Sequence, residues 1–463
     1  MTRLTAIAIA AATAAPAVAQ VPSALVSTVP GAASSVIPGR TESFANLDRP
    51  VFSPGREFYG FLGENSSGTS IGEDLYAIGN TDGSGLTVVA EELVTTIGGV
   101  VVDVLGERNF GIADSGMFGI EALIDTGSFN DDDLLVEAQY VPGVAPTYTV
   151  VFEEGVTAIP GIPGGIYDGA SGPSYGTGGF GGAFSSIDGV PTSGDTAAVT
   201  GNGSTVIVRE GETAVTGATA PGAPAGIYTS ISFAGHRGDG TNGVGRTRID
   251  PTDGSSTVDV LVCNGEVALY QGQALPGLGG DGVLDGFYST AAIQPDGGFL
   301  QIVDTADGAA GIVDETGTIL ATTGDGLFAQ DVATSSSAAD FFSANEDAAG
   351  NLLVGGFEVG TEDAIWVYNG QIILREGDQV DITGDGVPDD AFVAVNSLFS
   401  ASLDNITLDG AFIVDESTAI VGTALNDGAG NEIGLAFISV AIPEPTTASI
   451  LGLAGLTLLR RRR

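Results

Sequence analysis

Short runs of alternating apolar and polar residues recur along this chain about every 50 to 60 residues. Each run opens on a Gly turn and ends beside a Gly or an acidic residue. The run at 368–378 has close copies at 201–212, 263–273 and 315–325, and weaker copies at 83–93 and 146–156. A period of this length is typical of one supersecondary unit, here of about four strands. The six runs close at Glu92, Gly155, Gly211, Gly272, Gly324 and Gly377.

Neighbouring segments of each repeat supply the other strands. Asn369-Gly370 and Asn264-Gly265 each separate two apolar runs, and an Asn-Gly pair in this place is a strong signal for a two-residue β-hairpin. Further upstream, another apolar run follows a Gly, and downstream a Gly- and Pro-rich connector ends on an aromatic residue. No segment before the C-terminal tail combines a sustained helical period with helix caps. The body is therefore predicted to be all-β.

A small sheet with two apolar faces cannot bury both of them alone, and a closed ring of such sheets solves this problem while protecting strand edges. Six closing strands are visible, and a seventh unit over residues 409–442 stops before its last strand. The strand-like segment 23–29 can supply that strand. We therefore predict a seven-bladed β-propeller over residues 20–442, with about four strands in each blade, closed by an N-terminal strand. A tandem of β-sandwiches or an elongated β-solenoid is the alternative.

Residues 1–19 have the features of a secretory signal peptide. Arg3 precedes an Ala- and Ile-rich stretch that ends on Ala-Val-Ala, which predicts a helical signal and cleavage between Ala19 and Gln20. The stretch is too short and too rich in Ala for a membrane span. We therefore expect an exported protein that signal peptidase processes.

The chain ends on an uncharged, mostly apolar segment, residues 446–459, which is followed by four arginines. As a helix it would reach about 21 Å, short of a hydrocarbon core of about 30 Å, and the arginines would stay on the cytoplasmic side. A Pro-Glu-Pro triplet precedes it, and the ordered series resembles the PEP-CTERM sorting signal of Gram-negative and related bacteria. The residues that carry the resemblance are Pro443, Glu444, Pro445, Arg460, Arg461, Arg462 and Arg463.

This resemblance implies a route for the protein after export. In the PEP-CTERM family a membrane cysteine protease, exosortase, recognises the triplet and removes the tail. It implies that residues 443–463 are a sorting signal with a short transmembrane helix, and that exosortase is a second partner. The implied destination is the cell envelope, the cell surface or the extracellular matrix, where exopolysaccharide is a candidate partner.

The repeats themselves also resemble a family. The segments LDGAF (408–412) and AAGNLLVGGF (348–357) are similar to the NxxGxxAF core of tandem-repeat proteins that often carry the same sorting signal. DSGMFGIEA (114–122) is a looser match, and the other repeats lack the Asn or the Ala-Phe. The resemblance implies a propeller-like surface protein, and it assigns no catalytic residue.

Composition narrows the classes of partner. The chain has 58 acidic residues against 14 basic ones, all of them Arg, and a formal net charge of −44. Such a charge repels nucleic acid and anionic lipid headgroups. No nucleic-acid partner is therefore expected, and membrane contact is expected only through the C-terminal tail before processing. With 43% hydrophobic residues, the chain can still bury a large core.

The segment 381–390, DITGDGVPDD, is the best candidate for a metal site. Its oxygen-bearing side chains follow the alternate spacing of calcium loops, with Gly386 at the tight turn. The bidentate Glu of such loops is missing, because Phe392 holds the twelfth position. Ca²⁺ binding and a plain Asp- and Gly-rich turn therefore both stay open, and no other cofactor is expected. The candidate ligands are Asp381, Thr383, Asp385, Asp389 and Asp390.

Few residues of the sequence could form a catalytic site of a known type. His236 is the only His and Cys263 the only Cys, which excludes His- or Cys-type zinc sites and an intramolecular disulfide. No GxSxG elbow surrounds a Ser. We expect His236 in a solvent-facing loop, Cys263 as a small buried residue of a strand, and Trp366 in the core. The sequence therefore predicts that the protein is not an enzyme.

Three functions remain open because a fold does not determine a function. The favoured one is an exported, non-catalytic surface or extracellular-matrix protein. The second is a carbohydrate-binding propeller assisted by calcium. The third is a secreted glycoside hydrolase or lyase, since so many acidic residues make accidental carboxylate pairs unavoidable.

Overall fold

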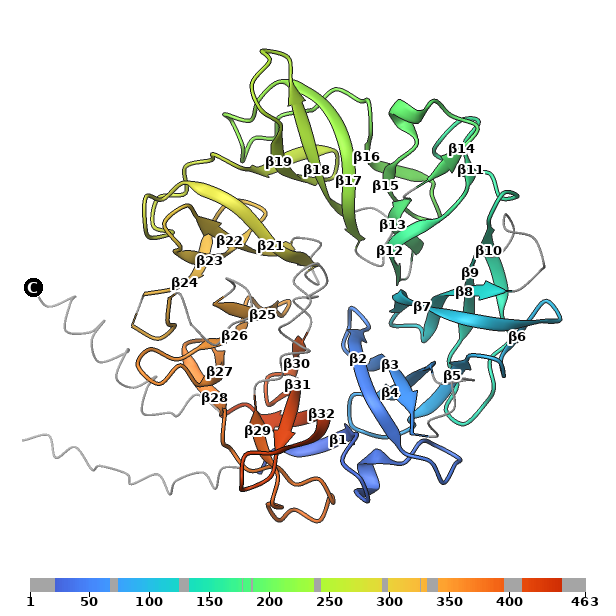
Figure 1. The fold of residues 1–463 in the computed structure, drawn as a ribbon, viewed down its shortest axis with the longest axis vertical. Coiled ribbons are helices and arrows are strands. Elements are labelled where there is room, and N and C mark those ends of the chain that lie inside the picture. The colour runs from blue at the N-terminus through green and yellow to red at the C-terminus, as the bar shows by residue number, and fades with distance from the viewer. Residues whose placement is uncertain are drawn as a thin grey trace, which may run out of the picture.

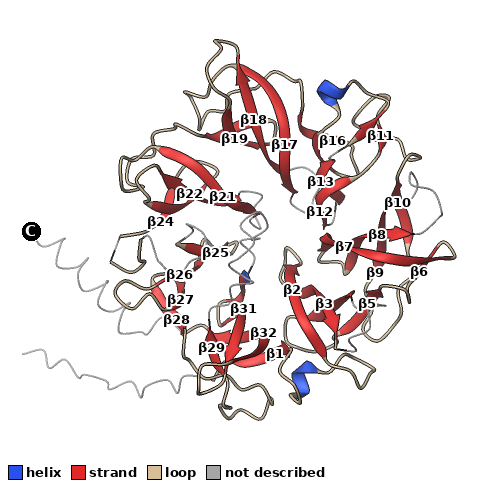
Figure 2. Ribbon diagram, in the orientation of Figure 1, coloured by secondary structure: helices blue, strands red, loops and turns tan. Residues whose placement is uncertain are grey.

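The computed structural model describes residues 21–66, 74–124, 133–176, 178–184, 186–236, 243–293, 299–324, 326–330, 340–394 and 410–443. These residues form an all-β ring of seven blades, as the repeats predict (Figure 1). Two short 3-10 helices, η1 (Ala33–Ser35) and η2 (Thr192–Gly194), lie at the periphery (Figure 2). The predicted helical signal peptide and helical tail lie outside the described residues.

Blades 1 to 3 are antiparallel sheets whose strands follow one another from the centre outward (Figure 1). Blade 1 comprises β2 (Phe44–Phe52), β3 (Phe58–Asn65), β4 (Asp74–Asn80) and β5 (Thr87–Glu91). Blade 2 comprises β7 (Val100–Ile112), β8 (Met117–Ile124), β9 (Asp133–Gln139) and β10 (Thr149–Glu153), with β6 (Thr96–Ile97) paired to β7. Blade 3 comprises β12 (Ala170–Gly176), β13 (Gly179–Phe184), β15 (Ala197–Thr200) and β16 (Thr205–Arg209), beside the pair β11 (Ile166–Tyr167) and β14 (Ile187–Asp188).

Blades 4 to 6 repeat this arrangement with four strands each. Blade 4 comprises β17 (Gly226–His236), β18 (Gly243–Pro251), β19 (Val258–Cys263) and β20 (Glu266–Tyr270). Blade 5 comprises β21 (Leu284–Ile293), β22 (Phe299–Thr305), β23 (Ala310–Asp314) and β24 (Ile319–Thr322). Blade 6 comprises β25 (Phe341–Glu346), β26 (Leu352–Phe357), β27 (Ala364–Tyr368) and β28 (Gln371–Arg375).

Blade 7 takes its strands from both ends of the chain. β31 pairs with β32, and β32 pairs with β1, so the N-terminal strand is the outer strand of this blade, as predicted. The inner edge of β31 is shared by β29 and β30. The inner strand is therefore divided in two, and the sequence pattern predicted only its second half. The bounds are β1 (Ser23–Ser27), β29 (Phe392–Ala394), β30 (Ala411–Asp415), β31 (Thr418–Asn426) and β32 (Glu432–Ala441).

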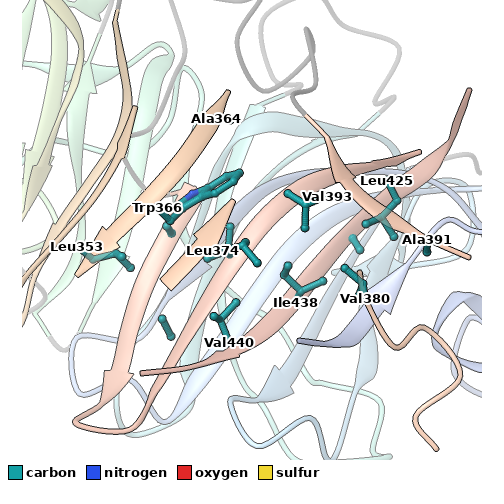
Figure 3. Close-up of a cluster of buried hydrophobic side chains, with 14 of the residues drawn as sticks. Leu353, Ala364, Trp366, Leu374, Val380, Ala391, Val393, Leu425, Ile438 and Val440 are labelled. Atoms are coloured by element: carbon teal, nitrogen blue, oxygen red, sulfur yellow. The ribbon is translucent and has the colours of Figure 1, made fainter. Parts of the chain in front are cut away.

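The core is divided among the blade interfaces. Buried apolar side chains of the described residues form seven clusters, one between each pair of consecutive blades. Figure 3 shows the cluster between blades 6 and 7, where Trp366 lies with Leu374 and Ile438. Trp366 is buried, which confirms the prediction that it belongs to the core. Each large apolar side chain buried in this way contributes about 1.5–3 kcal/mol, so every blade depends on both neighbours.

The Asn-Gly turns are confirmed. Asn264 and Gly265 have φ of 51° and 86° and join β19 to β20, while Asn369 and Gly370 have φ of 47° and 80° and join β27 to β28. Positive φ at both positions is typical of a two-residue hairpin whose twist matches that of the strands. The Asn side chain adds a second role, because Asn369 Oδ1 accepts the Leu352 amide at 2.9 Å.

A repeated hydrogen bond links the end of the outer strand to the next blade in blades 1, 3, 4 and 6. In blades 3, 4 and 6 the second residue after the outer strand has positive φ, and its amide donates to the inner strand that follows. In blade 1 this residue is Leu93, with φ of 56°, and not Glu92 as the sequence pattern predicts. A non-Gly residue in this conformation is uncommon, which explains the error of one residue. The bonds are Leu93 to Val102, Gly211 to Tyr228, Gly272 to Leu284 and Gly377 to Val393, at 2.7–2.8 Å.

Candidate functional site

The two ends of the described chain meet at the outer edge of blade 7. There β1 is paired on both of its edges, with β32 on one side and with the connector from blade 6 on the other. The Ala24 amide donates to the Asp381 carbonyl at 2.9 Å, and the Asp381 amide donates to the Pro22 carbonyl at 2.9 Å. The closing strand β1 therefore makes backbone hydrogen bonds on both of its edges.

Thr28 extends this pairing beyond β1. Its amide donates to the Leu435 carbonyl at 2.8 Å, and its Oγ1 accepts the Leu435 amide at 2.8 Å. Gly434 permits the close approach, because a Cβ there would lie 2.6 Å from Thr28 Oγ1. Both Thr28 and Leu435 are buried, so water cannot replace either bond. Sequence reasoning missed these residues, because nothing local marks a partner that is 407 positions away.

The predicted calcium loop lies beside this closure and folds around its own first carboxylate. Asp381 is 2% exposed, with Oδ1 accepting the amides of Gly384 at 2.6 Å and Thr383 at 3.1 Å. Its Oδ2 accepts the Gly386 amide at 2.7 Å. Burial alone would raise the pKa of Asp381, but the hydrogen bonds from Gly386, Gly384 and Thr383 outweigh it and hold the pKa below its usual value.

Two other predicted ligands, Asp385 and Asp389, also accept backbone hydrogen bonds within the turn. Asp389 Oδ2 accepts the Ile382 and Thr383 amides at 2.8 and 3.1 Å, and Asp385 Oδ1 accepts the Val387 amide at 2.9 Å. Asp390 is exposed. Within the described part of the chain, no group of three or more His, Cys, Asp or Glu side chains is placed to hold a metal ion. These contacts fix the Asp381 backbone that pairs with β1, and Ca²⁺ binding and a plain turn both stay predictions.

Of the predicted processing residues the structure describes Pro443, which lies next to the closure. Because β1 and β32 are antiparallel, with Ser23 opposite Ser439, the chain enters β1 and leaves β32 at the same end of blade 7. The Ile442 amide donates to the Ser417 carbonyl at 2.7 Å, and Pro443 after it is exposed. The other processing residues lie outside the described residues, namely Ala19, Gln20, Glu444, Pro445, Arg460, Arg461, Arg462 and Arg463.

Two further residues were singled out by the sequence. Cys263 ends β19 and is partly buried, and burial together with the negative charge of Glu315 raises the pKa of its thiol to about 11. The group therefore stays a thiol at neutral pH and is a poor nucleophile. His236 is the last residue of β17 and pairs with Gly243. The expectation of a loop position was wrong, because pairing with β18 extends the strand to this residue.

In the residues that the structure describes, no helix is both long and apolar enough to cross a membrane. The short transmembrane segment expected in the tail lies outside those residues.

Comparison with known proteins gives only distant structural similarities. No protein-family model matches the chain, and no curated protein matches it. The propeller of Dos1 is 10% identical, with a TM-score of 0.34 over 86% of this chain and 78% of that chain. The β-propeller domain of the Trilobed protease from Pyrococcus furiosus is 10% identical, with a TM-score of 0.41 over 87% and 99%. A Trypanosoma rangeli sialidase is 9% identical, with a TM-score of 0.30 over 88% and 56%. Similarity at this level carries no argument about activity.

Proposed function

We propose that the chain is an exported, non-catalytic protein of the cell surface or extracellular matrix, sorted by exosortase. The observation that carries the proposal is the place where the chain leaves blade 7. β32 ends at Ala441, Ile442 makes the last hydrogen bond to the blade, and Pro443 is exposed. Removal of the tail at the Pro-Glu-Pro triplet would therefore take no strand from the ring.

The carboxylates of the candidate metal loop support a non-catalytic role. Both carboxylate oxygens of Asp381 and Oδ2 of Asp389 accept backbone amides of their own loop. Asp381 is therefore a poor general acid, because the hydrogen bonds that it accepts stabilise its ionised form and hold its pKa below the usual value. We accordingly assign these acids to the ring closure and not to polysaccharide cleavage.

Sorting can be tested in a bacterium that has exosortase. The wild-type chain, Glu444→Ala and the control Glu432→Ala, an exposed Glu of β32 outside the triplet, would be expressed and fractionated. Intact mass should show that wild type and control begin at Gln20, lack the tail and leave the membrane fraction, whereas Glu444→Ala keeps its tail and stays in the membrane. A wild-type protein that keeps residues 1–19, or the same distribution for all three, would contradict the proposal.

The non-catalytic part needs a separate measurement. The released protein would be incubated with the exopolysaccharide of its host, and reducing or unsaturated ends would be followed over a day. We expect no new ends above the level given by heat-denatured protein. Multiple turnovers per protein molecule would show an enzyme.

A further inference from the structure

The interface between blades 2 and 3 contains carboxyl groups as well as apolar side chains. Glu121 of β8 is only 7% exposed, although it stands in an otherwise apolar strand. Its carboxyl group lies within hydrogen-bond reach of the carboxyl group of Asp133 on β9. From blade 3, Tyr167 Oη donates to Asp133 Oδ2 at 3.2 Å. Two acids of one blade thus meet a hydroxyl group of the next inside the core.

One proton would complete the hydrogen bonding of this group. Asp133 Oδ1 is buried and finds no donor among the described residues, whereas a proton on Glu121 would supply one. Burial, followed by the charge and hydrogen bond of Asp133, raises the pKa of Glu121 well above its usual value. Burial also raises the pKa of Asp133. The folded pair therefore holds a proton at a pH at which separate carboxyl groups in water have lost theirs.

The groups around the pair are themselves acids or phenols. Tyr175 Oη of β12 donates to Glu137 Oε2 of β9 at 2.6 Å across the same interface. The Glu154 amide donates to the Asp133 carbonyl at 3.0 Å. Burial raises the pKa of Tyr167 well above its usual value, and the charges of Asp133, Glu121 and Glu154 add to this effect. A second negative charge on the pair would therefore be repelled from several sides. The titratable groups of these elements are Glu121, Asp133, Glu137, Glu153, Glu154, Tyr167, Asp168 and Tyr175.

We propose that the interface of blades 2 and 3 is a proton-dependent latch, which is closed while Glu121 and Asp133 share a proton and opens locally as that proton is removed. Opening exposes both carboxyl groups to water, where they ionise without mutual repulsion. The latch belongs to the ring itself and does not depend on the proposed cellular function.

The direction of the pH effect follows from proton linkage. The closed interface binds the shared proton more tightly than the open one, so a rise in pH favours the open state. The effect begins near the pKa of an exposed carboxyl group, about 4, and ends at the raised pKa of the closed pair. Between these limits the open population rises about tenfold per pH unit for one proton released.

Hydrogen exchange of the full chain, followed by mass spectrometry between pH 5 and 9, tests the latch. Rates would be divided by the intrinsic rate at each pH, which leaves the opening equilibrium. A peptide covering 166–176 reports blade 3 at the latch, and one covering 226–236 reports the interface of blades 3 and 4 as an internal control. We expect the opening equilibrium of 166–176 to rise about tenfold per pH unit within the window, and that of 226–236 to stay flat.

Two variants identify the groups responsible. Glu121→Gln and Asp133→Asn each remove the shared proton, so the slope of 166–176 should disappear in both. Near-UV circular dichroism at pH 6 would check that each variant is folded. Equal slopes in the two wild-type peptides would overturn the proposal, and that comparison needs no variant. An unchanged slope in a folded Glu121→Gln protein would overturn it as well.

Discussion

Thr28 and Leu435 exchange two hydrogen bonds across nearly the whole chain, one from the Thr28 amide and one to its side-chain oxygen, each 2.8 Å long. They stand where the outer strand of blade 7 ends. Blade 7 combines strands from both ends of the described chain, whereas the other blades take their strands from continuous stretches of sequence. Contacts between such distant residues close late in folding, since the loop-closure entropy must be overcome first.

The first prediction concerns the side-chain half of this exchange. Thr28→Val keeps the shape but leaves the buried Leu435 amide without an acceptor, so it should lower the free energy of unfolding by about 2 kcal/mol. Thr28→Ser keeps the oxygen and should cost less than 1 kcal/mol. Urea unfolding of the three proteins measures both effects. Equal losses in Val and Ser would mean that the hydrogen bond contributes nothing.

A second prediction concerns Asn369. Asn369→Ala loses both the tolerance for positive φ and the acceptor for the Leu352 amide, and should cost about 2–3 kcal/mol. Asn369→Gly keeps the backbone conformation and loses only the side-chain hydrogen bonds, namely the acceptor for Leu352 and the exposed donor to Asn351, so about 1 kcal/mol is expected. Denaturant titration would separate the two contributions. A Gly variant as unstable as the Ala variant would show that the backbone conformation is not what selects Asn.

The third prediction is a pH dependence at Asp381. Its pKa is lowered in the folded protein, so its contribution to stability is complete above the unfolded pKa, about 4, and is lost as the pH falls through the folded value. Asp381→Asn removes this contribution. The wild type should therefore be the more stable at pH 7, and the difference should shrink as the pH falls below about 4. Urea midpoints across this range test it, and a constant difference would contradict the assignment.

Calcium gives a fourth prediction. Both oxygens of Asp381 and Oδ2 of Asp389 already accept backbone amides, and a metal that used them would have to displace these bonds. Millimolar Ca²⁺ should therefore shift the melting temperature no more than Mg²⁺ at equal ionic strength. A calcium-specific rise that Asp381→Asn abolishes would make this loop the metal site.

Features that depend on neighbouring residues could be predicted from the sequence. The Asn-Gly turns and the repeat length follow from local patterns, and strand counting located the closing strand at residues 23–29, where β1 lies. The position of Leu93 could not be predicted, because no Gly marks its left-handed backbone conformation. Strand β29 could not be predicted either. It has only three residues, and its partner β31 starts 24 positions after its last residue, Ala394.

The contact between the buried acids Glu121 and Asp133 could not be predicted for a different reason. Glu121, Asp133 and Tyr167 come from three strands, and no spacing connects them in the sequence. The one available signal was Glu121, a single acid inside the apolar run 118–124. Conversely, the spacing of 381–390 resembled a calcium loop because hydrogen bonds to backbone amides and metal coordination both require closely spaced Asp residues in a turn.

A disulfide across the closing strand tests the central claim, that residues near the N-terminus complete the seventh blade. Ala24 lies opposite Ile438, and in a Cys263→Ser background Ala24→Cys with Ile438→Cys should form an intramolecular disulfide and raise the melting temperature. The control pair Ala24→Cys with Ile420→Cys, on β31, should remain reduced, because β32 lies between them. Absence of the 24–438 disulfide in the folded monomer, or equal oxidation of both pairs, would contradict closure of the ring by β1.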